Sequence, residues 1–311
     1  MDNKSQIRKA VLADAGYATR FLPITKTLPK SMLPILDKPI TQYIVEECMV
    51  AGITEIIIVA TEEGKPIYED YFHNTVQHIY RQLSKQGKNE RFSKVTDVFN
   101  LPNIIVITQD KGLPYGNAAP LLSAKPYIGD EPVIYIYTDD FVMGTSACTD
   151  LIDAYAVCSN DVTGIIAAQD MPGIDVTKYG MIKLKDGTEN VLDYIIEKPK
   201  VEESPSNLVS FGRYLLTPKI FDYFTADEND LGKDSELWTV DAIHRMAKDT
   251  KVLVKPITGE WKTTGDPINY LKTAIDFALS HPEYNGEFQE YLRQLSSKQE
   301  PDRTPISNQS W

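Results

Sequence analysis

Short apolar runs alternate with segments of helical periodicity through the first 140 residues of the chain. Two segments, 40–52 and 66–85, carry apolar side chains at helical spacing, and a small-residue helix follows Asn117, its predicted N-cap. Four runs have the length and the apolar, often β-branched composition of buried strands. They are 10–13, 53–60, 104–108 and 132–137. This alternation predicts a doubly wound, mostly parallel α/β sheet.

The second half of the chain has a more mixed pattern. Two strand-like segments, 180–184 and 191–196, flank the turn sequence Asp186-Gly187 and predict a β-hairpin. Further strands are predicted at 162–168, 209–216 and 252–257. Helices are predicted at 218–224, 236–247, 267–279 and 287–295. Because no repeat and no linker separates these elements, we expect one domain over 1–295 and a polar tail over 296–311.

Composition and charge narrow the range of functions. The formal net charge of −12 argues against nucleic acid or an anionic membrane surface as a partner. No apolar run approaches the roughly 20 residues that span a bilayer, and the first 16 residues contain no uninterrupted apolar region of signal-peptide length. Cys48, Cys148 and Cys158 have no metal-ligand spacing and are expected to be reduced thiols. A cytoplasmic location is the default expectation.

Candidate chemistry gathers where predicted strands end. A loop with Gly16 and Arg20 follows the first strand, and Lys30 lies in the next loop. Small residues let backbone N–H groups approach phosphate oxygens, and fixed cations neutralise the phosphate charge. Gln109 and the pair Asp139-Asp140 follow later strands, and carboxylates of this kind favour Mg²⁺. Each feature alone also fits an ordinary loop or strand end, but together they predict one crevice at the carboxyl edge of the sheet.

The segment from Lys9 to Pro39 resembles a known family. Thr19-Arg20-Phe21-Leu22-Pro23 and Pro29-Lys30-Ser31-Met32-Leu33-Pro34-Ile35 are similar to the opening motif of bacterial UTP–glucose-1-phosphate uridylyltransferases, which are sugar-1-phosphate nucleotidyltransferases. The resemblance covers roughly residues 9–279. Weaker matches follow in the family's order at 109–117, 139–140, 179–180, 197–199, 212–214 and 236–243.

The resemblance implies a fold and a reaction. The fold is Rossmann-like (GT-A-like), with a mostly parallel mixed sheet flanked by helices and a small inserted β-hairpin that helps to bind sugar. Residues 1–145 would bind the nucleotide and 146–295 the sugar. The sugar-1-phosphate oxygen would attack the α-phosphorus of UTP in line with departing pyrophosphate, with Mg²⁺ as cofactor. The family's members often form homo-oligomers.

The resemblance also assigns roles by position. Arg20 would face the triphosphate, Lys30 would bind phosphate near the reacting centre, and Asp139 would ligate Mg²⁺. The uracil and ribose would be held by Ala15, Gly16, Gln109 and Gly116. The sugar would be lined by Tyr179, Gly180, Glu197 and Gly212, with Lys198 on the sugar phosphate.

Three positions depart from the family pattern. Ala18 replaces a glycine, which is costly if the backbone there needs a positive φ. Asp14 stands where the family has a small neutral residue, and its charge would repel phosphate unless it points away. Thr263 takes the position of a second metal-binding aspartate, for which Asp266 or Asp140 could substitute.

These departures keep alternatives open. The chain could use dTTP or another sugar-1-phosphate, or it could be a catalytically impaired relative that only binds UDP-sugar. A Rossmann dehydrogenase would need an acidic residue about 20 positions after the glycine turn, at the end of the next strand. That strand, 53–60, comes much later and ends in Thr61-Glu62, so this reading is disfavoured.

Overall fold

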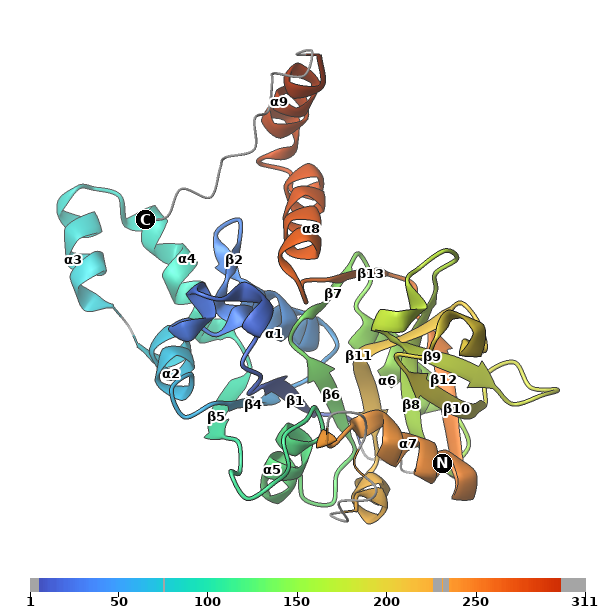
Figure 1. The fold of residues 1–311 in the computed structure, drawn as a ribbon. Coiled ribbons are helices and arrows are strands. Elements are labelled where there is room, and N and C mark those ends of the chain that lie inside the picture. The colour runs from blue at the N-terminus through green and yellow to red at the C-terminus, as the bar shows by residue number, and fades with distance from the viewer. Residues whose placement is uncertain (1–5, 75, 226–230, 232–234, 298–311) are drawn as a thin grey trace.

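The computed structural model describes residues 6–74, 76–225, 231 and 235–297 (Figure 1). The part of the predicted polar tail from residue 298 onward, and most of the polar loop predicted at 227–233, lie outside these residues.

The first half of the chain forms the parallel centre of the sheet. Its strands are β1 (Lys9–Asp14), β4 (Glu55–Ala60), β5 (Asn103–Thr108) and β6 (Val133–Tyr137). They lie in the order β6-β1-β4-β5, and every neighbouring pair is parallel. The middle of each strand is buried because helices cover both faces, which explains their nearly continuous apolar sequence.

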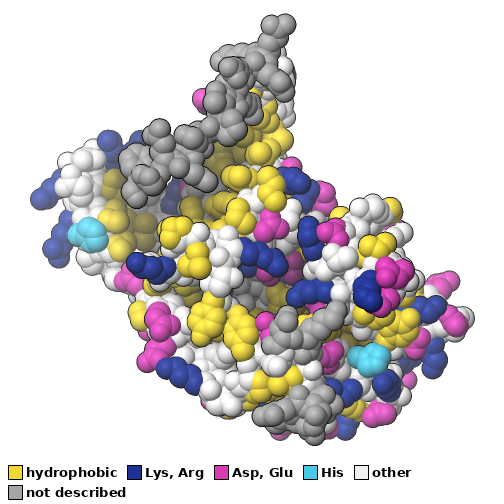
Figure 2. Space-filling model, in the orientation of Figure 1, with side chains coloured by type: hydrophobic (Ala, Val, Ile, Leu, Met, Phe, Trp, Pro, Cys, Tyr) yellow, Lys and Arg dark blue, Asp and Glu magenta, His cyan; other side chains and the backbone are white. Residues whose placement is uncertain are grey.

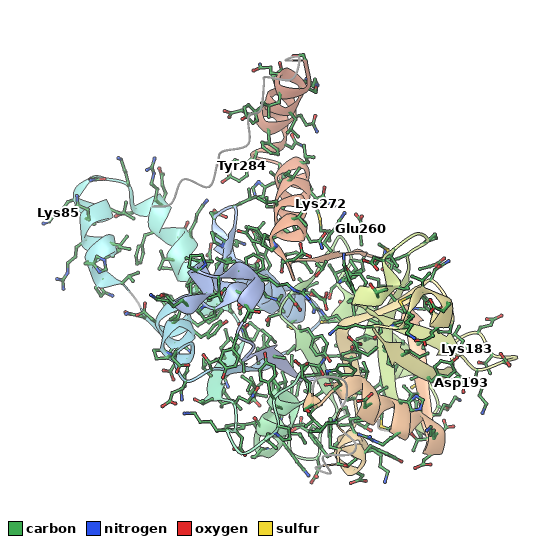
Figure 3. All side chains as sticks on the ribbon, in the orientation of Figure 1. Lys85, Lys183, Asp193, Glu260, Lys272 and Tyr284 are labelled. Atoms are coloured by element: carbon green, nitrogen blue, oxygen red, sulfur yellow. The ribbon has the colours of Figure 1, made fainter. Side chains whose placement is uncertain are left out.

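The second half extends the same sheet with a different pairing. Its strands are β8 (Val162–Asp170), β9 (Gly180–Leu184), β10 (Leu192–Glu197), β11 (Leu208–Leu216) and β12 (Lys251–Pro256). β11 is antiparallel to β6, β8 and β9, whereas β12 is parallel to β8. The predicted hairpin is confirmed as β9 and β10, with Lys183 and Asp193 at its outer edge (Figure 3). The sheet therefore has nine strands and is mixed, with a mainly parallel centre, as the α/β prediction requires.

Helices flank the sheet on both sides. Buried side chains of α1 (Ile40–Val50), α2 (Lys65–His73) and α6 (Ala147–Val157) belong to the core on one face. Those of α5 (Ala119–Ile128) and α7 (Thr239–Asp249) belong to the core on the other face. Two further helices, α8 (Pro267–Ser280) and α9 (Asn285–Ser297), project from the body of the molecule (Figure 1).

The helix predicted over 66–85 is wrong in one respect, because it is broken in two. α2 ends at His73, and α3 (Gln77–Lys85) begins after a break. The side chain of Asn74 accepts a hydrogen bond from the backbone N–H of Val76, and Val76 has a left-handed φ of 37°. Asn offers the backbone such local hydrogen bonds in competition with the helix, so Asn74 is the residue in this segment that marks the break. A short helix, α4 (Ser93–Thr96), follows.

Three smaller features complete the fold. The predicted helix at 218–224 is a 3₁₀ helix over Pro218–Tyr223. The strands β2 (Pro34–Ile35) and β3 (Lys38–Pro39) form a ribbon in the opening segment. An unpredicted ribbon of β7 (Asp140–Met143) and β13 (Glu260–Thr263) places Thr263 opposite Asp140.

In the part of the chain that the structure describes, no helix combines the length and the apolar character needed to span a membrane.

Candidate functional site

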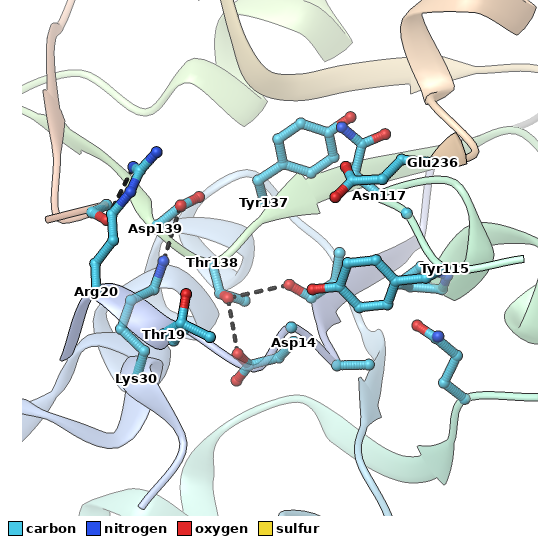
Figure 4. A pocket seen from close by; sticks show the side chains of 18 residues that line it. Asp14, Thr19, Arg20, Lys30, Tyr115, Asn117, Tyr137, Thr138, Asp139 and Glu236 are labelled. Atoms are coloured by element: carbon cyan, nitrogen blue, oxygen red, sulfur yellow. Dashed lines mark hydrogen bonds and ion pairs between the residues drawn. The ribbon is translucent and has the colours of Figure 1, made fainter. Parts of the chain in front are cut away.

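A cavity of about 340 Å³, which we call the first cavity, opens at the carboxyl ends of β1, β5 and β6. Figure 4 shows its lining side chains converging from separate loops. Seven of the predicted site residues line it: Ala15, Gly16, Arg20, Lys30, Gln109, Gly116 and Asp139. The structure thus brings together residues that are up to 124 positions apart in sequence, Ala15 and Asp139, as the parallel sheet predicts.

A second cavity of about 210 Å³ adjoins the first. The remaining predicted site residues line it: Tyr179, Gly180, Glu197, Lys198 and Gly212. Both cavities share Arg20, Asn117, Tyr137, Asp139 and Gly265. Asp139, in the turn between β6 and β7, therefore lies where the two cavities meet.

The backbone of the opening loop is strained at Ala18, the residue that replaces a glycine of the family pattern. Ala18 adopts φ 47° and ψ 48°, which is the left-handed region. A β-carbon in this region costs roughly 1 kcal/mol or more. Two hydrogen bonds hold the turn, because the Ala18 carbonyl accepts from Phe21 N at 3.0 Å and from Thr25 Oγ1 at 3.0 Å.

Asp14 is buried and faces hydroxyl groups. Thr138 Oγ1 donates to Asp14 Oδ1 at 3.0 Å, and the hydroxyl of Ser31 donates to Asp14 Oδ2 (Figure 4 draws the first of these). Burial raises the pKa of Asp14 to about 7. Near neutral pH the carboxyl is therefore partly protonated, which reduces the repulsion of phosphate expected from the sequence.

Lys30 and Asp139 form the central ion pair of the site. Lys30 Nζ lies 2.8 Å from Asp139 Oδ2, and the lysine side chain is only 13% exposed. Burial acts to raise the pKa of Asp139, but the charge of Lys30 and its hydrogen bond outweigh it and the pKa is lowered. Arg20 lies at the same edge, with Nη1 3.5 Å from the carbonyl of Gly265. Asp139 is therefore an ionised carboxylate beside two cations.

In Asp140, the next residue, both carboxylate oxygens accept hydrogen bonds from other parts of the protein. Its Oδ2 accepts from Gly212 N at 2.7 Å, and its Oδ1 accepts from Trp261 Nε1 at 2.7 Å. Burial and the neighbouring charge of Asp139 raise its pKa. Asp266 is also occupied, because both of its oxygens accept hydrogen bonds from Asn269 at the start of α8. Both carboxylates therefore already hold parts of the fold, and the substitution of either for the aspartate that Thr263 replaces stays a prediction.

Arg213 fixes the turn that carries Asp139. It lies on β11, is fully buried, and pairs with Glu47 of α1 at 2.9 Å. Its Nη1 donates to the carbonyl of Tyr137 at 3.1 Å, and its Nη2 donates to the carbonyl of Asp140 at 2.8 Å. These bonds satisfy carbonyls on both sides of Asp139, and a buried carbonyl left unpaired would be costly.

Two glycines are required by close approach. A β-carbon on Gly212 would lie 2.2 Å from Cβ of Tyr137, where β11 meets β6. Gly116 has φ +147°, and a β-carbon there would lie 2.2 Å from the carbonyl oxygen of Leu237. Larger residues at either position would push apart the walls of the two cavities.

Glu197 and Lys198 stand together in the second cavity. Burial raises the pKa of Glu197 to about 6, although the charge of Lys198 acts in the opposite direction. Lys198 Nζ lies 3.9 Å from Glu197 Oε1 and 5.5 Å from the ring centroid of Trp238. A buried carboxylate beside a cation can accept hydrogen bonds from hydroxyl groups while the cation faces an anion.

Several lining residues were missed or misassigned by the sequence analysis. The prediction that Asn117 is the N-cap of α5 is wrong, because its side chain accepts from Thr239 N, the first N–H of α7, at 2.8 Å. Tyr115, Tyr137 and Glu236 also line the first cavity. Glu236 lies within a matched segment, 236–243, which could have suggested it, whereas nothing local in the sequence marks Tyr137 as a lining residue.

The donor set at Asp139 fits a metal that is held mainly by substrate. Among the described residues, no three His, Cys, Asp or Glu side chains are grouped to hold a metal ion. Thr263 Oγ1 lies 3.5 Å from the carbonyl of Asp139 and accepts from Gly265 N at 3.1 Å. Mg²⁺ is often bound by one or two carboxylates plus substrate phosphates. One carboxylate with a nearby hydroxyl is consistent with that mode of binding.

Comparison with known proteins decides the family. The family model described as nucleotidyl transferase matches residues 9–279. The chain belongs to this family. Enzymes of this kind generally use a divalent metal.

Individual relatives agree with this nucleotidyltransferase assignment. A UTP–glucose-1-phosphate uridylyltransferase from Staphylococcus epidermidis is 39% identical over 293 residues, covering 93% of this chain and 99% of the relative. A protein of the same name from Streptococcus pyogenes is 36% identical, covering 97% and 98%.

Solved structures agree as well. A UTP-bound UGPase from Acinetobacter baumannii superposes with a TM-score of 0.80 at 29% identity, covering 93% of this chain and 99% of that structure. A UDP-glucose pyrophosphorylase complexed with UDP-glucose gives a TM-score of 0.75 at 31% identity, covering 88% and 100%. The predicted fold class, the resemblance to the uridylyltransferases and the assignment as a nucleotidyltransferase are confirmed.

Proposed function

We propose that this nucleotidyltransferase transfers a uridylyl group from UTP to glucose-1-phosphate, giving UDP-glucose and pyrophosphate. The observation that carries the proposal is the meeting of the two cavities at Asp139, with Lys30 and Arg20 beside it. Relatives that carry the name of this activity match nearly the whole chain.

In the first cavity, the nucleotide is held at both ends. Gln109 offers a donor and an acceptor to the edge of the uracil. The backbone around Ala15, Gly16 and Gly116 approaches the base and ribose. Arg20 faces the triphosphate and the leaving pyrophosphate, and Lys30 stabilises the negative charge that develops on the transferring phosphate.

In the second cavity, Glu197 accepts hydrogen bonds from sugar hydroxyls and Lys198 binds the sugar phosphate. The walls at Tyr179, Gly180 and Gly212 orient the sugar so that its phosphate oxygen points at the α-phosphorus. The protein forms no covalent intermediate. Its contribution is to hold two anions in line and to neutralise their charge.

We assign the divalent metal as Mg²⁺ at Asp139, with Thr263 as a neutral neighbour. When bound, Mg²⁺ supplies positive charge to the reacting phosphates. Asp139 is ionised and its second oxygen is not engaged by Lys30, so the carboxylate retains capacity to bind a cation.

The test is turnover by the purified protein with UTP, glucose-1-phosphate and Mg²⁺, followed by pyrophosphate release. We expect UDP-glucose and pyrophosphate in equal amounts. Absence of both at high enzyme concentration would reject the proposal. A panel with dTTP, galactose-1-phosphate and N-acetylglucosamine-1-phosphate separates the alternative substrates, because sugar choice depends on the shape of the second cavity.

Thr263 favours a second candidate, a relative that binds UDP-sugar with impaired catalysis. A hydroxyl is a weaker, neutral ligand than the carboxylate of the family pattern. Under this candidate, Thr263→Asp raises turnover strongly and tightens the binding of Mn²⁺ in the presence of UDP-glucose, measured by electron paramagnetic resonance. Under the leading proposal the wild-type chain is already active, and the substitution changes turnover little.

We also propose a division of labour and a setting for the enzyme. Residues from about 1 to 145 bind the nucleotide and residues from about 146 to 295 bind the sugar, within one domain.

A cytoplasmic location stays a prediction. A homo-oligomer is proposed because α8 exposes Ile268, Leu271 and Ile275 at helical spacing. Figure 2 shows apolar side chains on the part of the molecule that projects from the body. Sedimentation velocity measures the assembly state.

A further inference from the structure

Two tyrosines from distant loops meet at the rim of the first cavity. Tyr17 follows Gly16 after β1, and Tyr115 precedes Gly116 after β5. Their rings are stacked, with centroids 5.6 Å apart and planes inclined by 14°. They remain 67% and 45% exposed, although large aromatic side chains usually lose most of their exposed surface on folding. The stacked pair therefore presents aromatic surface to the solvent beside a polar cavity.

The backbone around Tyr115 is rigidly placed. Leu237 N donates to the carbonyl of Tyr115 at 2.8 Å, and Ala118 N donates to the carbonyl of Leu237 at 3.0 Å. Gly116 is pressed against Leu237 between these bonds. Burial raises the pKa of Tyr115, and a backbone hydrogen bond from Tyr17 partly offsets the rise. The ring is thus held in place before any ligand arrives.

The two tyrosines differ in what they line. Tyr115 lines the first cavity with Gly16 and Gln109, and its hydroxyl lies 3.9 Å from the position of a β-carbon on Gly16. Tyr17 is absent from the residues that line this cavity, but it lines a neighbouring cavity of about 340 Å³ together with Tyr115 and Gln109. Tyr17 therefore covers one side of the Tyr115 ring, and the first cavity lies beside the rest of that ring.

We propose that Tyr115, supported by Tyr17, is the stacking surface for the pyrimidine base whose edge Gln109 reads. The proposal rests on the proposed function and names a residue that selects for a nucleobase within that site. Cations at Arg20 and Lys30 bind phosphates but give no affinity for the base. A flat aromatic ring beside Gln109 supplies that affinity, because aromatic side chains stack on bases of any type.

Calorimetric titration with two ligands tests the proposal. UDP carries the base, and inorganic pyrophosphate has phosphates without a base. We expect Tyr115→Ala to weaken UDP binding about ten-fold and to leave pyrophosphate binding unchanged, since the loss comes from stacking. Tyr115→Phe keeps the ring and stays within about two-fold of the wild type. Tyr17→Ala should weaken UDP binding about two- to three-fold, because the Tyr17 ring acts only by supporting that of Tyr115.

Two comparisons sharpen the test. Tyr115→Ala weakens CDP by the same factor as UDP, because stacking is indifferent to the base, whereas Gln109→Ala changes the ratio between UDP and CDP. The loss in Tyr115→Ala is independent of ionic strength, unlike losses of phosphate contacts. Tyr127, which is 43% exposed and does not line either cavity, is the matched control, and Tyr127→Ala leaves every titration unchanged.

Two results would overturn the stacking role. One is unchanged or tighter UDP binding by Tyr115→Ala. Unchanged binding would mean that the ring does not contribute to affinity, and tighter binding would mean that it obstructs the cavity. The other is an equal loss of UDP and pyrophosphate, which would mean that the loop has collapsed. Failure of the wild-type chain to turn over UTP and glucose-1-phosphate would reject the proposed function instead, while the difference between UDP and pyrophosphate still decides the role of Tyr115.

Discussion

The two cavities meet at Asp139 but are built from different chemistry. The first combines two cations, Lys30 and Arg20, with the acids Asp139 and Glu236 and with buried Asp14, whose pKa is raised to about 7. The second pairs an acid with a cation, Glu197 with Lys198, and has aromatic walls such as Trp261. Fixed cations suit a triphosphate, whereas hydrogen-bond acceptors and flat apolar faces suit a sugar.

Two adjacent residues at the boundary between the cavities, Asp139 and Asp140, also differ in what they contact. Asp139 faces a lysine and keeps its charge, whereas both oxygens of Asp140 accept hydrogen bonds from the protein. One aspartate is therefore available to ligands and its neighbour holds the walls together. Substitutions that affect one cavity and spare the other test this division.

The largest effect is expected for Asp139→Asn. Removing a carboxylate that lines both cavities should lower turnover by at least about 10³-fold. The melting temperature should stay close to that of the wild type, because Asp139 is partly exposed. Asp140→Asn is the matched control and should lower the melting temperature, because Gly212 and Trp261 lose a carboxylate partner. Near-normal turnover in Asp139→Asn would remove this residue from the reaction.

The next effect is expected for Lys30→Ala. Loss of the buried charge should reduce kcat/KM by about 10²- to 10³-fold, mainly through kcat. Steady-state kinetics with pyrophosphate detection measures it. Lys26 lies in the same loop and is exposed, so Lys26→Ala should behave as the wild type. Equal losses in both variants would show that only the general charge of the loop matters.

A smaller and pH-dependent effect is expected at Glu197. Its pKa of about 6 means that the carboxylate becomes protonated as the pH falls through this value. The KM for glucose-1-phosphate should then rise while the KM for UTP changes less. Glu197→Gln should raise the same KM about ten-fold at pH 8 and remove the enzyme's share of the pH dependence. The sugar phosphate itself also titrates, but it does so equally for the wild type and for Glu197→Gln, so the ratio of the two KM values reports on Glu197 alone. If the KM of both enzymes changed with pH in the same way, Glu197 would not be the group that binds the sugar.

The smallest effect on activity is expected for Asp14→Asn, which acts on stability. The folded pKa of about 7 lies above the value of 3.8 for an unperturbed aspartate. The unfolded state therefore binds fewer protons, and stability falls as the pH rises from about 4 to about 7. The Asn variant should be more stable above pH 7 by about 1–3 kcal/mol, measured by urea unfolding at pH 5 and pH 8. An equal gain at both pH values would mean that ionisation is not the cause.

Sequence patterns were sufficient for the elements whose signal is local. The β-branched run 53–60 predicted a buried strand, which is β4, and Asp186-Gly187 predicted the turn of a hairpin, which is formed by β9 and β10. The carboxyl-edge rule for parallel sheets then placed Gly16, Gln109 and Asp139 on one crevice without any structure.

Contacts between distant segments could not be read in this way. Asn117 looked like a cap for the helix after it, but it caps α7, more than 100 residues later. Asp140 looked like a second candidate ligand beside Asp139, and the positions of Gly212 and Trp261 show that its oxygens hold the fold. Such roles depend on which backbone N–H groups and rings arrive from elsewhere in the chain, and a single sequence does not state this.

The buried guanidinium of Arg213 has a consequence for synthesis of the chain. When residues 1–145 have been synthesised, the chain contains every predicted nucleotide contact and the strand that precedes Asp139. The carbonyls of Tyr137 and Asp140 still lack the partner that β11 brings from residue 213. A nascent chain of this length therefore lacks the guanidinium that holds the turn of Asp139, and this group arrives only when about two thirds of the protein has been made.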